Sequence, residues 1–480
     1  MSRLLAADDR ALLPVPGWVP AALLLAATAV AGPMLGGLAR PVFVLGCGAV
    51  GWYAWRRGPG EHLQAALVLF AFAPFVRRLV DLSAGYDQAG LMLVGPLLAL
   101  LAVLPALWRR LESDRPFDRR FGPLLLVGAC VAYATALSMI QGDWMNAASG
   151  ALKWAVPLVY AAALIDAARA DELVRRAAGA FVVILPIIGL YGIWQYVAPP
   201  DWDRYWMSFA PIMSAGQPIP FGVRTFSTLN GPASFATFTA VGLLLVGFLR
   251  PGWQVLLVAP AALAFLLSLY RTAWLSLAVG LLFCLAFAVT RRRAGVTLAG
   301  LAAAAIVAAT LTPFGEVIGD RLATLSDGSQ DGSLQERLEQ YVTLWSQGDG
   351  TLFGSGFTVG DVGSAGVMAI DGMIVACWVA MGIAVGLVCL AGFVWAAGTA
   401  IAAAARVGDR EAVVIGALAC GALFQMPLAS IASGELGFLF WTFVALAPAA
   451  AAAAPAAAAS AAARVRPRTP GPAGPPRTIR

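Results

Sequence analysis

The sequence contains a single histidine, His62, and its acidic residues do not cluster at spacings typical of metal ligands. Charged residues are also scarce: they make up 12% of the 480 positions, about half their usual share in soluble proteins. The six cysteines all lie within apolar stretches and show neither zinc-site spacing nor a disulfide framework. These absences exclude an ordinary soluble fold and a multi-histidine metal site, and we expect neither a metal nor another cofactor.

Apolar residues dominate instead, at 60% of the chain with a mean hydropathy of +0.79. Runs of helical length recur along the whole sequence, at about 18–39, 41–55, 63–77, 91–108, 121–140, 152–167, 178–198, 229–249, 253–270, 272–290, 294–313, 369–398, 412–428 and 436–452. The pattern predicts an all-α polytopic membrane helix bundle with about 14 transmembrane helices.

The basic residues predict an orientation for this bundle. Most of the Lys and Arg residues fall on one side when the helices alternate and both termini are placed in the cytoplasm. Residues 1–17 are then a cytoplasmic N-terminus without a cleaved signal peptide, and residues 18–452 form the transmembrane domain. Residues 453–480, rich in Ala, Pro and Arg, form a disordered cytoplasmic tail. Two long loops, 199–228 and 314–368, face outward.

Arg271 stands in LLSLYRTAWLSL, a hairpin with almost no loop on the outer side. An intramembrane charge costs several kcal/mol unless it has a partner, so such a residue is a functional candidate. The alternative is a structural salt bridge to an acidic residue on a neighbouring helix.

Arg224 precedes FSTLNGPASF, where the chain enters the membrane again. Ser227, Thr228 and Asn230 are candidate caps for the helix that follows. The positive end of a helix beside an arginine is a natural site for phosphate. Pairing of Arg224 with one of the loop aspartates, Asp201 or Asp203, is the alternative.

Two further arginines lie on the outer side beside acidic residues. In FVRRLVD, Arg77 and Arg78 precede Asp81 by four and three residues, a spacing that allows a local ion pair on a helix. Arg337 lies in an amphipathic pattern, LQERLEQYVTLW, with glutamates close by on either side. We treat Arg78 and Arg337 as candidate substrate-binding residues, with local ion pairs as the alternative.

Asp371 and Glu435 each open an apolar run at the predicted outer boundary. A carboxylate in this position is either a general base, an arginine partner or a plain stabiliser of the helix N-terminus. In the first outer loop, Trp202, Tyr205 and Trp206 are candidates for stacking on sugar rings or for anchoring the loop at the membrane interface.

A series of motifs along residues 65–445 resembles the superfamily of O-antigen ligases and polysaccharide polymerases. The motifs are YGIWQYVAPPDWDRYWM, RTFSTLNGPASFATF, LYRTAWLSL, RLEQYVTLW with LFGSGF, IDGMIV and GELGFLFW, and FVRRLVD fits the exopolysaccharide-polymerase branch. Ligases of this superfamily usually carry a histidine in or after the large outer loop, and this sequence has none there. Tyr270 replaces the usual serine before the boundary arginine. These departures favour a polymerase.

The resemblance implies a metal-independent membrane glycosyltransferase of the bacterial inner membrane. Its donor and acceptor are glycans linked to undecaprenyl pyrophosphate; membrane lipids and other polysaccharide-export proteins are further expected partners, and nucleic acid is not. Arg224 and Arg271 would bind the leaving pyrophosphate, and Asp371 would accept the hydroxyl proton or hold the acceptor. The alternatives are a ligase that transfers glycan to lipid A core or protein, and a flippase or transporter of lipid-linked oligosaccharides.

Overall fold

The computed structural model describes residues 15–113, 117–165, 170–210, 213–311, 342, 345–346, 352–357 and 372–447. Within these residues the chain is helical, with one isolated antiparallel bridge between Gly216 and Val223 and no β-strand. Eight of the described helices are long and apolar enough to cross a membrane, and three shorter apolar helices accompany them. The all-α polytopic membrane bundle is confirmed, and the count of about 14 spans stays a prediction.

The first half of the chain packs as hairpins of long helices. Its helices are α1 (Trp18–Leu35), α2 (Ala39–Arg57), α3 (Pro59–Ala84), α4 (Val94–Leu100), α5 (Leu104–Leu111), α6 (Gly122–Ile140), α7 (Trp144–Leu164) and α8 (Ala170–Val197). The first two helices turn back on each other at Gly36–Leu38 and share a core cluster with α3. The remaining helices contribute to a second, larger core.

The second half begins with a short helix and returns to long ones. It contains α9 (Asp201–Phe209), α10 (Pro232–Leu249), α11 (Gly252–Leu257), α12 (Ala259–Leu267), α13 (Arg271–Leu285), α14 (Ala288–Leu311), α18 (Met373–Val407), α19 (Arg410–Gln425) and a helix over Gly434–Ala447. The predicted boundary at Arg291–Arg293 is wrong. The chain turns at Ala286–Phe287 instead, where Thr290 Oγ1 donates to the carbonyl of Cys284, and the arginines continue the new helix.

Helix starts follow the local sequence in most places. Pro59 and Pro232 open α3 and α10, where a missing N–H costs nothing. Asp143 and Asp409 cap α7 and α19 through their carboxylates. The predicted cap for α10 is wrong, because its N-cap is Gly231 and no side chain bonds there.

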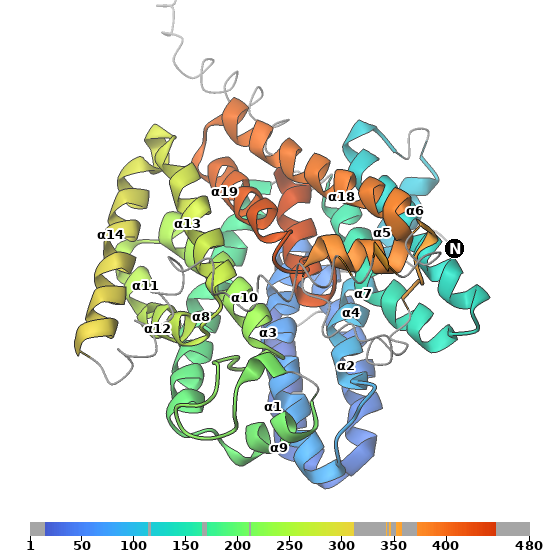
Figure 1. Cartoon of the computed structure of the whole chain (residues 1–480), viewed down its shortest axis with the longest axis horizontal. Coiled ribbons are helices and arrows are strands. Elements are labelled where there is room, and N and C mark those ends of the chain that lie inside the picture. Colours follow the sequence, from blue (N-terminus) through green and yellow to red (C-terminus); the bar gives the residue numbers. More distant parts are fainter. Residues whose placement is uncertain are drawn as a thin grey trace, which may run out of the picture.

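The helix ends gather into two opposite groups of polar contacts. We call one the α9 end: it contains the Gly36–Leu38 turn, the C-termini of α3 and α8, α9, residues 213–231 and the α12–α13 junction. Helix α9 lies in the lower part of Figure 1. The other is the Arg250 end, where Arg176 pairs with Glu61 at 2.7 Å and Arg175 with Glu411 at 3.1 Å. Helices α3 and α8 run between these two ends, and which end faces which side of the membrane stays a prediction.

Helix α18 is broken at Gly382, whose φ of 74° lies in the left-handed region that favours glycine. A break frees backbone carbonyls that lipid cannot satisfy. The segment Leu352–Phe357 docks there: Ser355 N donates to Val379 O at 2.8 Å and Gly356 N to Ala380 O at 3.0 Å. The LFGSGF motif thus completes the hydrogen bonding of a bent membrane helix.

Candidate functional site

The α9 end forms around a junction between two distant parts of the chain. Residues 213–231 run beside the α12–α13 connection, where Thr225 N donates to Leu267 O at 3.1 Å. The loop is also tied to α8, because Phe221 N donates to Tyr196 O at 2.8 Å. These backbone bonds hold the loop against the ends of α8 and α12. The side chains of the loop are not used in them and remain available for other contacts.

Arg224 and Arg271 are brought together at this junction. Arg224 donates from Nη1 to Ser214 O at 3.3 Å and from Nη2 to Leu269 O at 3.5 Å, and Leu269 is two residues before Arg271. Leu269 adopts a φ of 53°, which turns the chain so that α13 begins at Arg271. Both arginines are half-buried, and each carries a permanent positive charge at or beside this turn.

Polar atoms in front of α10 lie close in sequence to Arg224. The hydroxyl of Thr228 and the Oδ1 atom of Asn230 are buried and make no hydrogen bond to any described residue. Buried polar atoms are normally satisfied, so this stretch is suited to a polar ligand. The predicted alternative for Arg224 is not seen: Asp203 pairs elsewhere, and the carboxylate of Asp201 lies 3.9 Å from Arg204.

Arg78 has a different environment from the one predicted. Its Nε lies 2.8 Å from Asp203 Oδ1, and both side chains are fully buried. It also donates to the backbone carbonyls of Ser227 and Leu229, and its guanidinium lies 5.0 Å from the centre of the Phe226 ring. All these contacts tie α3 to α9 and to the loop that carries Arg224, so the observed partners of Arg78 are structural.

Gln195 is the residue that sequence reasoning missed. Its Oε1 accepts the backbone N–H groups of Phe226 and Ser227 at 3.1 and 2.8 Å, and its Nε2 donates to Asp203 Oδ2 at 2.6 Å. Tyr191, one helical turn earlier, donates to the same Oδ2 at 2.7 Å. The signal was a glutamine and a tyrosine four residues apart on one helix face, just before the end of an apolar run.

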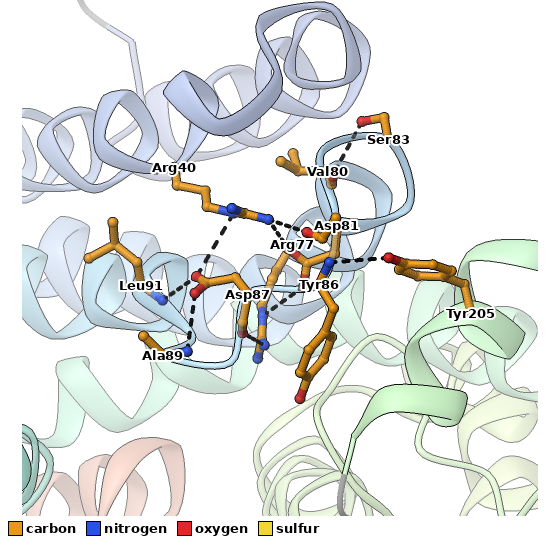
Figure 2. Close-up of polar contacts among 11 residues, drawn as sticks. Arg40, Arg77, Val80, Asp81, Ser83, Tyr86, Asp87, Ala89, Leu91 and Tyr205 are labelled. Carbon is orange, nitrogen blue, oxygen red and sulfur yellow. Dashed lines mark hydrogen bonds and ion pairs between the residues drawn. The ribbon is translucent and has the colours of Figure 1, made fainter.

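A second ionic cluster braces the same end, as Figure 2 shows. Asp81 accepts from Arg40 at 2.9 Å and from Arg77 at 3.2 Å, which confirms the local Arg77–Asp81 pair. Arg77 also donates to the backbone carbonyl of Asp87 and lies 5.4 Å from the centre of the Tyr86 ring. The cluster joins the start of α2 to the end of α3. It also holds Tyr86 and Asp87, which follow α3.

The aromatic candidates divide into buried and accessible rings. Trp206 is 2% exposed and packs on Phe226, which removes it from sugar stacking. Tyr205 is half-buried, accepts from the Tyr86 backbone N–H at 3.2 Å (Figure 2) and packs on Phe209, which is 55% exposed. Trp202 is half-buried and donates to Tyr191 OH at 2.7 Å.

The acidic candidates and Arg337 are only partly placed. Glu435 is half-buried in the first turn of the helix Gly434–Ala447. Asp371 and Arg337 lie outside the described residues, as does most of the predicted amphipathic helix near Arg337.

Residues 255–373 match the family model described as O-antigen ligase. This segment is similar to O-antigen ligases. The superfamily predicted from the sequence is confirmed, and the match supports an enzyme of the ligase or polymerase type. A comparison with curated proteins finds no match.

The O-antigen ligase match covers one side of the junction. Arg271, α12 to α14 and the docked segment Leu352–Phe357 lie within it, whereas Arg224, Arg78 and Gln195 precede it. The two arginines therefore lie on either side of the contact between the matched segment and residues 213–231.

In the described ranges no three His, Cys, Asp or Glu side chains gather to hold a metal ion. His62 is buried at the start of α3, where its Nε2 lies 3.0 Å from Ala99 O, far along the helix from the α9 end. The described site thus offers guanidinium groups and hydroxyls, which suit oxyanion binding.

Proposed function

We propose that this chain is a polysaccharide polymerase of the bacterial inner membrane. It joins oligosaccharide repeat units carried on undecaprenyl pyrophosphate into an exopolysaccharide or O-antigen chain at the periplasmic face. The observation that carries the proposal is the contact of Arg224 with the Leu269 turn, two residues before α13 begins at Arg271. The O-antigen ligase match supports the reaction class.

The reaction requires stabilisation of a leaving pyrophosphate. A hydroxyl at the non-reducing end of one glycan attacks the anomeric carbon of the other, and the bond from that carbon to the phosphate oxygen breaks with inversion. Negative charge grows on the pyrophosphate in the transition state, where fixed cations are most effective. Arg224 and Arg271 would bind its oxygens, since guanidinium binds phosphate in a bidentate manner and keeps its charge.

The acceptor hydroxyl must lose a proton to a base. Asp371 is the proposed base or acceptor-holding residue, and Glu435 is a substrate-binding residue on the neighbouring stretch. Met373 N donates to Met426 O at 2.9 Å, so the start of α18 lies beside the connection that leads to Glu435. Tyr205, Trp202 and the exposed Phe209 would contact sugar rings near α9.

The lack of a histidine in or after the predicted large outer loop favours a polymerase over a ligase. The one histidine of the sequence is buried at the other end of α3 and contacts Tyr160 and Ala99. A ligase that relies on an outer-loop histidine would lack that residue here. Transfer would then proceed without a metal, because cationic side chains supply the charge.

The test is reconstitution of the purified protein with a lipid-linked repeat unit, followed by separation of the products on a gel. A ladder of lengths is expected, and it should persist in EDTA. A single addition to lipid A core or protein would indicate a ligase. Movement of the lipid-linked unit across the bilayer without a new glycosidic bond would indicate a flippase and overturn the proposal.

A further inference from the structure

Three half-buried arginines gather at the Arg250 end of the bundle: Arg250, Arg293 and Arg410. Arg293 donates to the carbonyls of Phe248 and Arg250 at 2.7 and 3.1 Å, and Arg410 lies near enough for its charge to act on Arg293. Among the described residues none of the three forms an ion pair with a carboxylate. The described part of the chain therefore gives these three charges no direct carboxylate partner.

Neighbouring arginines at the same end are matched by acidic residues. Arg175 pairs with Asp171 and Glu411, and Arg176 with Glu61 and Glu172. The three-arginine cluster differs from these two arginines in having no carboxylate partner among the described residues. An unpaired, partly desolvated guanidinium attracts an anion strongly.

Arg250 is directed toward the membrane groove. Its Nη2 donates to Arg175 O at 3.2 Å, and it lies so close to Gly179 that a Cβ there would overlap it. Its Nε is buried and makes no hydrogen bond to a described residue. Burial lowers the pKa of Arg250 below its ordinary value, which marks a charge held away from water.

The groove begins at Gly179 and Gln64 and runs between α1, α3 and α8. Its volume is about 360 Å³, and its walls are almost entirely apolar, including Ala26, Val68 and Val183. It ends at Val76, twelve residues along α3 from Gln64. At 1.5 Å per residue this is about 18 Å, a little over half the hydrocarbon thickness of a bilayer.

We propose that this groove binds one anionic phospholipid, with its phosphate at Arg250 beside Arg293 and Arg410 and one acyl chain along α3 and α8. The charge of the cluster selects the headgroup, and the length of the groove matches a chain within a single leaflet. The site lies at the opposite end of the bundle from Arg224 and Arg271. It therefore does not depend on the proposed glycan chemistry.

Binding is tested with the purified full chain in detergent, with thermal melting followed as phosphatidylglycerol or phosphatidylcholine is added. Phosphatidylglycerol should raise the melting temperature and phosphatidylcholine should not. Arg250→Gln should weaken the apparent affinity for phosphatidylglycerol about fivefold, the effect expected for one arginine near a charged membrane surface. Arg250→Lys, which keeps the charge, should retain most of the affinity for phosphatidylglycerol.

Arg292→Gln is the matched control, because Arg292 is exposed and lies on the same turn of α14 as the half-buried Arg293. It should bind phosphatidylglycerol like the wild type. Equal weakening by both glutamine variants would show diffuse surface attraction and overturn the site. Without lipid, all variants should have the melting temperature of the wild type. Weaker lipid binding by such a variant is then not caused by misfolding.

The groove has its own test. Ala26→Trp should fill it from the exposed side of α1 and reduce the stabilisation by phosphatidylglycerol. Inorganic phosphate in place of lipid should give no stabilisation, and an equal effect would show a soluble-phosphate site. If polyprenyl phosphate stabilises the wild type better than phosphatidylglycerol and Ala26→Trp abolishes that effect, the groove holds a polyprenyl chain and the proposal is wrong.

Discussion

Arginines at the α9 end differ in burial, and burial separates their roles. Arg78 is fully buried against Asp203, whereas Arg224 and Arg271 are half-buried at the junction beside Leu269. A buried pair holds the loop in place, and a half-buried pair can exchange its present contacts for a phosphate. Substitutions at the two kinds of position should therefore fail in different ways.

Arg271→Ala should fold and lose activity. Removal of a charged contact to a developing oxyanion costs about 100- to 1000-fold in rate. Arg271→Lys should keep a little activity, because lysine retains the charge but not the planar fork. Polymer synthesis and a thermal melt in detergent are measured together, with Arg204→Ala as the control for an exposed arginine at the same end. Near-normal synthesis by a well-folded Arg271→Ala protein would assign the pyrophosphate to Arg224 instead.

Arg78→Met should destabilise the fold. It leaves Asp203 buried without its cation, which costs about 3–5 kcal/mol, and thermal melting should show the loss directly. The double variant Arg78→Met with Asp203→Leu should recover much of the stability, because no uncompensated charge remains. If the single variant melts like the wild type and only synthesis falls, Arg78 contacts substrate as the sequence analysis expected.

At this scale the sequence identifies charges but not their partners. Isolation at a membrane boundary was enough to single out Arg224 and Arg271. Only pairs three or four residues apart can be seen in a helical sequence, so the Arg77–Asp81 pair was predicted and the Arg78–Asp203 pair was not. Gln195 was missed because its hydrogen-bond partners, Phe226 and Ser227, lie 31 and 32 residues later in the sequence. Only the folded loop brings them to its side chain.

Among the elements, α18 shows how a local motif serves a distant helix. Hydropathy predicted one apolar run at 369–398, and the helix indeed covers Met373–Val407. Its break at Gly382 could not be predicted, because the hydrogen bonds that make the break tolerable come from Leu352–Phe357. The LFGSGF motif entered the sequence analysis only through the family resemblance, and no spacing rule predicts that it docks on α18.

Gly382→Ala should destabilise the protein. The position requires a positive φ, and a Cβ there would overlap the carbonyl oxygen of Leu352. The loss should exceed about 1 kcal/mol and lower the melting temperature in detergent. Gly398→Ala, on the same helix with open space around it, should be neutral or stabilising. Equal melting of the two variants would mean that the break is not held by the docked segment.

For the whole molecule, charged residues of several helices form a group at each of the two described ends. Glu61, Arg175 and Arg250 meet at one end, and Arg40, Asp81 and Arg224 lie at the other. Each group is assembled from several helices, so the two ends follow from packing and are independent of the positive-inside rule. Which end faces which compartment depends on that rule alone.

Cysteine labelling in intact cells tests the orientation, in a background without the six natural cysteines that still melts like the wild type. Ser214→Cys, exposed beside Arg224, should react with an impermeant maleimide from outside. Arg292→Cys, exposed at the Arg250 end, should react only after permeabilisation. Reaction of both positions from the same side would contradict the separation of the two ends. The reverse pattern would place Arg224 and Arg271 in the cytoplasm, where they could not act on glycans displayed at the periplasmic face.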